Sequence, residues 1–167
     1  MRLQPADPGG YPGVYRHAYA QRKSGTKACA DMVMDLVVPF YNPRQDWEFR
    51  FVTNIHTLID EHFGGDRNAL QIIIVNDGST ALFTDIETAY LRQHIPGLTI
   101  ISYPENQGKG YALRAGVAKT KTQYCVYSDN DFPFGLAAIR EMYDALQKGA
   151  DIVAACRTSG NYFRHLP

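Results

Sequence analysis

Leu70-Gln71-Ile72-Ile73-Ile74-Val75 is the stretch that decides the fold. It is a short apolar run rich in β-branched residues, and Asn76-Asp77-Gly78 follows it directly. Such a run is typical of a strand buried on both faces, which occurs in sheets that helices cover on each side. The stretch therefore predicts an internal strand of an α/β domain that ends in a polar loop.

Similar runs recur along the chain, with helical patterns between them. The predicted strands cover residues 32–38, 70–75, 98–102, 123–128 and 151–155, and Pro39 closes the first. Apolar residues recur at helical spacing over 51–63, 82–90, 112–117 and 136–146. Alternation of strands and helices predicts an α/β fold with a doubly wound, mainly parallel sheet and right-handed crossovers.

Composition favours one globular domain. The chain has 167 residues, of which 45% are hydrophobic, and its formal net charge is zero, which gives no electrostatic case for wrapping nucleic acid. The three cysteines show no metal-binding spacing, so we expect a reduced, cytoplasmic setting. No apolar stretch is long enough to span a membrane. Residues 1–30 lack a sustained period and are predicted to form an irregular arm before the domain at 31–167.

Polar residues follow four of the predicted strands. These loops are 39–43, 76–80, 103–110 and 129–131. Each loop by itself is explained by turns and helix caps, which use the same residue types. In a doubly wound sheet, however, the carboxyl ends of the strands meet at one edge, where ligands bind. Four such loops together predict a binding site at that edge.

Asp129 and Asp131 suggest a metal site. Residues two apart on an extended chain point the same way, so both carboxylates would face one small volume. Mg²⁺ and Mn²⁺ prefer oxygen ligands and are usually held by one or two carboxylates together with substrate phosphates. The alternative is a simple turn before a helix, with Pro133 in the first helical turn.

Asp77 and the run Gly108-Lys109-Gly110 complete the candidate site. The Asp77 carboxylate can accept hydrogen bonds from a nucleobase or from ribose, with room beside Gly78, or it can cap a helix that starts near Ser79. The glycines and Lys109 suit phosphate at a helix N-terminus. The run matches neither a Walker A loop nor a dinucleotide-binding fingerprint.

Other enzyme classes fit poorly. No Gly-x-Ser-x-Gly elbow is present, which speaks against a serine hydrolase of this fold class. A phosphoaspartate receiver would need its acidic pair after the first strand, where this chain has Pro39, Phe40 and Tyr41.

The ordered set of loops resembles a known family. The segments are Val-Val-Pro-Phe-Tyr-Asn at 37–42, Val-Asn-Asp-Gly-Ser at 75–79, Asn-Gln-Gly-Lys-Gly-Tyr-Ala-Leu-Arg-Ala-Gly at 106–116 and Asp-Asn-Asp at 129–131. Together they resemble the family 2 inverting glycosyltransferases of the GT-A fold, over about residues 35–157. Within that family, they are most similar to the branch that makes polyprenyl-phosphate hexoses, including dolichyl-phosphate mannose and glucose.

The resemblance implies a donor site for a nucleotide-diphosphate sugar, a UDP- or GDP-hexose. The donor-binding residues would be Pro39, Phe40, Tyr41, Asp77, Gly78, Gly108, Lys109, Arg114 and Asp129. Asp131, with Asp129, would bind Mg²⁺ or Mn²⁺. Arg157 stands where the polyprenyl branch often carries an arginine. The acceptor would be a saccharide or a lipid phosphate, and nucleic acid is not an expected partner.

The resemblance also implies a mechanism, a single in-line displacement at the anomeric carbon with inversion. A sugar acceptor needs a general base, which family members place further along the chain, so here it would lie downstream of Pro167. A lipid phosphate is already ionised and needs no such base. We therefore expect a domain that is truncated at its C-terminus, with membrane contact supplied only by segments downstream.

Two other functions stay open on the sequence alone. One is a nucleotidyltransferase, which would carry a Gly-rich basic loop after the first strand. The other is a non-catalytic nucleotide-binding module.

Overall fold

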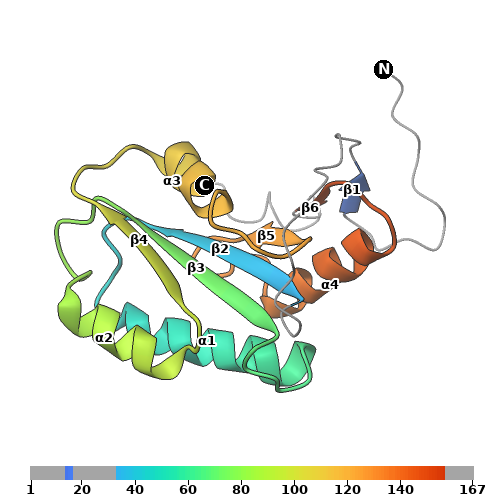
Figure 1. The fold of residues 1–167 in the computed structure, drawn as a ribbon, viewed down its shortest axis with the longest axis horizontal. Coiled ribbons are helices and arrows are strands. Elements are labelled where there is room, and N and C mark those ends of the chain that lie inside the picture. Colours follow the sequence, from blue (N-terminus) through green and yellow to red (C-terminus); the bar gives the residue numbers. More distant parts are fainter. Residues whose placement is uncertain (1–13, 17–32, 157–167) are drawn as a thin grey trace, which may run out of the picture.

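The computed structural model describes residues 14–16 and 33–156. Figure 1 shows a sheet with helices on both of its faces. The elements in chain order are β1 (Val14–Arg16), β2 (Met34–Phe40), α1 (Trp47–His62), β3 (Leu70–Asp77), α2 (Asp85–His94), β4 (Thr99–Tyr103), α3 (Lys109–Val117), β5 (Cys125–Tyr127), α4 (Leu136–Gln147) and β6 (Val153–Ala155). The predicted α/β fold is confirmed.

The main sheet has four parallel strands in the order β4-β3-β2-β5. From β2, the chain adds β3 and then β4 toward one edge, and it returns through α3 to place β5 on the other side of β2. The strand order therefore reverses next to β2. In sheets of this kind, the crevice for ligands lies at the carboxyl ends of the strands at that reversal.

Alternate residues of β2 and β3 build two cores, one on each face of the sheet. Leu36, Ile72 and their same-face neighbours pack with α1, α2 and α4. Val37 and Val75 belong to the smaller core under α3. Gly116 allows α3 to lie close to the sheet, because a Cβ atom there would be 2.4 Å from Cγ1 of Val37. This tight packing holds the last turn of α3 directly against β2 and β3.

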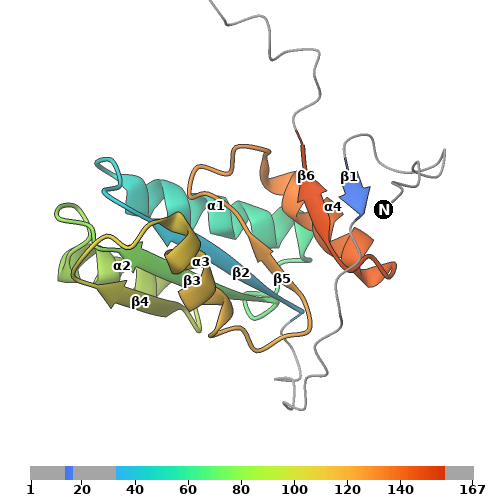
Figure 2. The same ribbon diagram turned by 90° about the horizontal axis from the view of Figure 1, so that it is seen from above.

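The last predicted strand is the main correction to the topology. We expected residues 151–155 to extend the parallel sheet, but β6 pairs antiparallel with β1 in a separate two-stranded sheet, with Val14 opposite Ala155. Both views place this small sheet beside α4 (Figures 1 and 2). The edge strand β5 has only three residues, so it offers a short ladder to a further strand.

Burial also differs from the prediction at the two edges of the sheet. β2 and β3 are internal and almost entirely buried, as expected. β4 and β5 are only partly buried, because each has a neighbouring strand on one side alone.

Three predictions fall on residues that the structure does not describe. Except for β1, the predicted arm at 1–30 lies outside the described residues. Arg157, the arginine that the resemblance singled out, also lies outside them. So does Pro167, the residue beyond which we expected a general base, and the location of any such base therefore stays a prediction.

Several predicted boundaries move, and two of the shifts have a clear physical cause. β2 continues through Pro39 to Phe40, because its pairing with β5 ends at Val37 and the absent N–H of Pro39 is therefore not needed. The second helix begins at Asp85 rather than near Leu82, and Thr84 caps it in a reciprocal capping box with Glu87. Within the described residues, no helix combines the length and hydropathy needed to cross a membrane.

Candidate functional site: a pocket at the carboxyl ends of the strands

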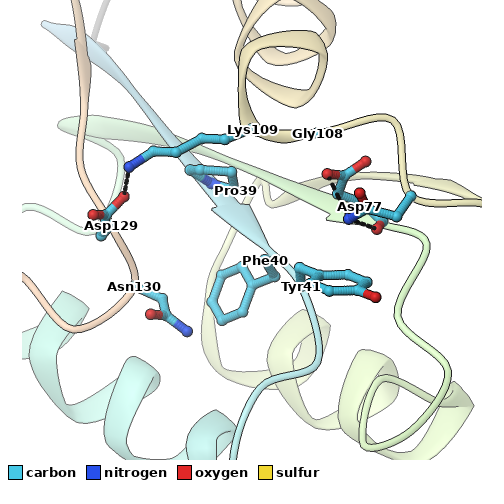
Figure 3. A pocket seen from close by; sticks show the side chains of 9 residues that line it. Pro39, Phe40, Tyr41, Asp77, Gly108, Lys109, Asp129 and Asn130 are labelled. Carbon is cyan, nitrogen blue, oxygen red and sulfur yellow. Dashed lines mark hydrogen bonds and ion pairs between the residues drawn. The ribbon is translucent and has the colours of Figure 1, made fainter.

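A pocket of about 300 Å³ lies at the carboxyl edge of the sheet, where the strand order reverses. Its lining comes from the ends of β2 and β3, from the start of α3 with the loop before it, and from the segment after β5. The lining residues are Pro39, Phe40, Tyr41, Asp77, Asn106, Gly108, Lys109, Asp129 and Asn130. Figure 3 shows these side chains around the end of β2, with Asp77 on one side and Asp129 on the other. The pocket therefore stands where the loop pattern predicted a binding site.

The end of β2 forms the aromatic wall of the pocket. Phe40 is 2% exposed, and its ring packs 4.5 Å from Trp47 and 5.3 Å from Phe51, measured between ring centroids. Tyr41 follows it but is 55% exposed. The buried ring anchors the chain, so that the next ring lies at the pocket surface, where a flat ligand can stack on it.

Asp77 is held rigidly at the end of β3. The residue is 3% exposed, and both of its carboxylate oxygens accept hydrogen bonds from the loop that leads to α3. Oδ2 accepts from Nδ2 of Asn106 at 3.0 Å, and Oδ1 accepts from the backbone N–H of Gln107 at 2.8 Å. Each oxygen keeps a further lone pair, so the carboxylate can still receive a ligand N–H or O–H.

Gly78 brings these two loops together. It has a φ of +68°, and a Cβ atom there would lie 2.3 Å from the backbone N of Asn106. Only glycine fits this combination of conformation and contact. We predicted that Gly78 makes room for a ligand, but the described structure uses that room for the backbone of Glu105 and Asn106, and Gly78 does not line the pocket.

Tyr103 lies close to the Asp77 carboxylate. Its hydroxyl oxygen is buried and makes no hydrogen bond of ordinary geometry in the described part of the chain. Burial raises the pKa of the Tyr103 phenol, and the interaction with the nearby Asp77 carboxylate raises it further. The phenol therefore stays neutral beside a carboxylate at physiological pH.

The start of α3 supplies the cationic group. Gly108 precedes the helix with a φ of 88°, and no side chain caps the first backbone N–H groups. Lys109 is the first helical residue, and its ammonium group forms an ion pair with Oδ1 of Asp129. A lysine and uncapped N–H groups at a helix N-terminus are groups that bind phosphate.

The Asp-Asn-Asp segment is not an extension of the strand. β5 ends at Tyr127, and the backbone N–H of Phe132 donates to the carbonyl oxygen of Asp129 at 3.1 Å, so the chain turns. Asp129 and Asn130 line the pocket, while Asp131 is exposed outside it. The expectation that alternation along an extended chain directs both carboxylates the same way is wrong here, because the segment is a turn.

Asp129 nevertheless fits one mode of metal binding. Among residues 33–156, no group of three or more His, Cys, Asp or Glu side chains gathers around one point. A cation held by one or two carboxylates and by substrate phosphates needs no such group. The Asp129 carboxylate faces the pocket and suits this mode.

The structure thus brings most of the predicted donor residues together. Asp131, Gly78 and Arg114 do not line the pocket, and Arg114 instead lies over the ring of Tyr111, 5.9 Å from its centroid. Asn106 and Asn130 line the pocket but were not predicted as site residues. Both lie in polar loop segments, where asparagine is usually read as a turn residue.

This fold and this pocket define an α/β domain with a pocket at the switch point of a parallel sheet, where such domains bind ligands. The family model "Glycosyl transferase family 2" matches residues 35–166, and the chain belongs to this family. It is accordingly a glycosyltransferase domain, and the predicted GT-A type agrees with this match.

Curated relatives are similar over part of their length. Dolichyl-phosphate beta-glucosyltransferase ALG5A of Trichomonas vaginalis is 26% identical over 102 residues, which are 61% of this chain and 31% of the relative. Dolichyl-phosphate beta-glucosyltransferase of Saccharomyces cerevisiae is 25% identical over 122 residues, 71% of this chain and 35% of the relative. The chain spans about a third of these proteins.

Solved structures include a more distant match. The crystal structure of S. aureus TarS 1-349 aligns with a TM-score of 0.45 and 16% identity, covering 60% of this chain and 28% of that chain. The assignment of the fold therefore rests on the strand order of the sheet and on the family match.

Proposed function

We propose that the domain binds a nucleoside-diphosphate hexose in this pocket and transfers the hexose to an acceptor with inversion, with Mg²⁺ or Mn²⁺ bound. The observation that carries the proposal is the arrangement of three charged groups around one pocket: Asp77 at one side, Asp129 at the other, and Lys109 from the start of α3. A nucleotide sugar carries matching groups: a base and ribose with N–H and O–H donors at one end, the hexose at the other end, and a negatively charged diphosphate between them.

Each wall would recognise one part of the donor. The base and ribose would lie against Tyr41 and donate hydrogen bonds to the Asp77 carboxylate, which Asn106 and the backbone of Gln107 hold in place. The diphosphate would lie near Lys109 and the N-terminus of α3. The hexose would then extend toward Asp129 and Asn130.

In the reaction, an acceptor oxygen forms a bond to the anomeric carbon while the bond from that carbon to the diphosphate oxygen breaks. The electron pair leaves with the nucleoside diphosphate, and Lys109 would stabilise the negative charge that develops there. A divalent cation supplies further stabilisation of that charge when bound. Asp129, with Asp131 after a change in the turn, would hold the cation.

The acceptor we propose is a lipid phosphate of the polyprenyl class. The relatives are named dolichyl-phosphate beta-glucosyltransferases, which supports both a hexose and this acceptor. A phosphate oxygen is ionised near neutral pH, so this chemistry requires no general base.

Calorimetric titration of UDP and of GDP, each with and without Mn²⁺, tests the donor site. We expect one of the two to bind with an affinity that Mn²⁺ increases, and we expect Asp129→Asn to remove most of that increase. Asp151→Asn, at an exposed position away from the pocket, is the matched control. Binding that is equal with and without metal would contradict metal dependence, and no binding of either nucleotide would contradict the donor site.

Incubation with a labelled nucleotide hexose then separates transfer from other reactions. Appearance of label on a short polyprenyl phosphate supports the proposed acceptor. Release of a nucleotidyl product would favour a nucleotidyltransferase instead. Tight nucleotide binding with neither product would favour a non-catalytic module.

A further inference from the structure

The ion pair between Lys109 and Asp129 joins the two groups that the proposed reaction would use separately. Figure 3 shows the Lys109 side chain extending over Pro39 to the Asp129 carboxylate. Of the nine residues that line the pocket, Lys109 is the only cationic one, and the lining residues belong to the described part of the chain. Its positive charge is therefore paired with a carboxylate of the same pocket.

We infer that this pair is an exchange device: a nucleoside diphosphate takes Lys109 from Asp129, and the freed Asp129 carboxylate then accepts the divalent cation. The inference rests on the proposed function of the pocket. One ammonium group cannot fully neutralise a carboxylate and a diphosphate at the same time. The diphosphate therefore competes with Asp129 for Lys109, and the cation competes with Lys109 for Asp129.

The burial of the pair sets the size of the effect. The side chains of Lys109 and Asp129 are 55% and 44% exposed, so water screens their attraction. Half-exposed ion pairs of this kind contribute roughly 0.2–1 kcal/mol, which corresponds to a change in affinity of about fivefold at most. The pair is thus strong enough to bias binding and weak enough for a ligand to break.

Because the diphosphate and the cation each displace one partner of this ion pair, their binding is positively cooperative. Once the diphosphate holds Lys109, the cation no longer has to displace it, so its affinity rises. By linkage, the cation must raise the affinity for the diphosphate by the same factor. This coupling adds to any direct contact between cation and phosphate, and it is absent when either partner of the pair is removed.

The neighbouring structure supports a change of partners without rearrangement of the sheet. Lys109 is the first residue of α3, and this helix packs closely on β2 and β3 at Gly116. The backbone of Lys109 is therefore held in place, while its long side chain can change rotamer. Asp129 stands in a turn after the short edge strand β5. The two groups can therefore separate through side-chain rotation alone.

Each of two single variants should increase the affinity for a different ligand. In Lys109→Met, Mn²⁺ alone should bind about two- to fivefold more tightly than in the wild type, because its competitor for Asp129 is gone. In Asp129→Asn with EDTA present, UDP or GDP should bind more tightly than in the wild type, because Lys109 is released. Lys119→Met, an exposed lysine just beyond α3, is the charge-matched control and should change neither affinity.

The double variant separates release of Lys109 from simple repulsion. Removing the Asp129 charge also relieves its repulsion of a diphosphate, and this part persists when Lys109 is already absent. We therefore expect Asp129→Asn to increase metal-free nucleotide affinity more in the wild-type background than in the Lys109→Met background. An equal increase in both backgrounds would overturn the inference, as would unchanged or weaker Mn²⁺ binding in Lys109→Met.

The failures of the two proposals are distinguishable. If the wild type binds neither nucleotide with Mn²⁺ present, the proposed donor site fails and the exchange device fails with it. If the wild type binds a nucleotide but the two variants do not show these two increases in affinity, the donor site stands and the exchange device alone is overturned. Circular dichroism of each variant confirms that the titrated protein is folded.

Discussion

Asp77 and Asp129 both line the pocket, yet the chain holds their carboxylates in different ways. Asp77 is 3% exposed at the end of an internal strand, and its two oxygens are bonded to the loop before α3. The Asp129 side chain is 44% exposed in a turn after an edge strand and has one ion pair, to Lys109. In the proposed function, the first carboxylate is a fixed group for ligand recognition and the second is the one that exchanges partners.

The difference follows from the position of each strand in the sheet. β3 is paired on both sides, and helices cover both of its faces, so its end is rigid. β5 has three residues and one neighbouring strand in the main sheet. One edge of this sheet thus combines a rigid wall at the end of β3 with a less constrained wall after β5. In the proposed function, the first wall recognises the nucleoside and the second lies near the reacting part of the donor.

The largest effect should come from Gly78→Ala. Residue 78 has a φ of +68°, and the new Cβ atom would lie 2.3 Å from the backbone N of Asn106. The end of β3 and the loop before α3 would therefore have to move apart. Strain and overpacking together should lower the free energy of unfolding by about 2–5 kcal/mol. Urea denaturation measures this loss.

Gly97→Ala is the control that isolates the close contact. Gly97 has the same φ of +68°, and a Cβ atom there would meet nothing within 4 Å. It should cost only the conformational strain, about 1–2 kcal/mol. Equal losses for the two variants would show that the approach of the two loops is not tight.

Asp77→Ala is expected to have the next largest effect. It removes the two hydrogen bonds that the carboxylate accepts, from Nδ2 of Asn106 and from the N–H of Gln107. The bond from Nδ2 of Asn106 to the backbone carbonyl of Asp77 remains, so the loop before α3 is held less firmly to β3. Hydrogen bonds to a charged group contribute about 1.5–3 kcal/mol, and we expect a loss of stability in that range. The exposed Asp151→Ala serves as the control, and an effect of the same size there would contradict a special role for Asp77.

Tyr103→Phe tests the surroundings of Asp77 through the pH dependence of folding stability. The folded protein raises the pKa of the Tyr103 phenol above its usual value, so the associated stability is present below about pH 10 and is lost as the pH rises further. The variant should lose less stability than the wild type between about pH 9 and about pH 11. Near pH 7 it should be unchanged or more stable by about 1 kcal/mol, because it removes a buried hydroxyl without a hydrogen bond in the described structure.

Asp129→Asn should have the smallest effect on stability. Its ion pair is half exposed, so thermal unfolding should change by less than about 1 kcal/mol. The same variant should nevertheless remove most of the Mn²⁺-dependent nucleotide binding. A loss of stability comparable to that of Asp77→Ala would contradict the view that the two walls differ.

The sequence predicted the rigid part of the molecule best. Residues 70–75 and the loops after β2 and β3 were placed correctly, because a strand buried on both faces has a distinctive composition. β6 was placed in the wrong sheet, because strand pairing over three residues depends on which edge is accessible in space.

The site residues follow the same pattern. Asp77, Lys109 and Asp129 line the pocket, and they were predicted because they belong to a set of polar loops that follow successive strands. The exposed position of Asp131 was not foreseen, since a one-residue spacing does not show where a strand ends and a turn begins. Asn106 has a role that depends on a contact 29 residues away, with Asp77, which local sequence cannot reveal.

A crystal structure with the nucleoside diphosphate and Mn²⁺ bound would test the central claim most directly. We expect Asp77 to keep its hydrogen bonds to Asn106 and Gln107 and to accept a bond from the base or ribose. We expect Lys109 to leave Asp129 for the diphosphate, with the Asp129 carboxylate on the cation. A diphosphate bound while Lys109 still pairs with Asp129, or a nucleotide bound away from Asp77, would contradict the account.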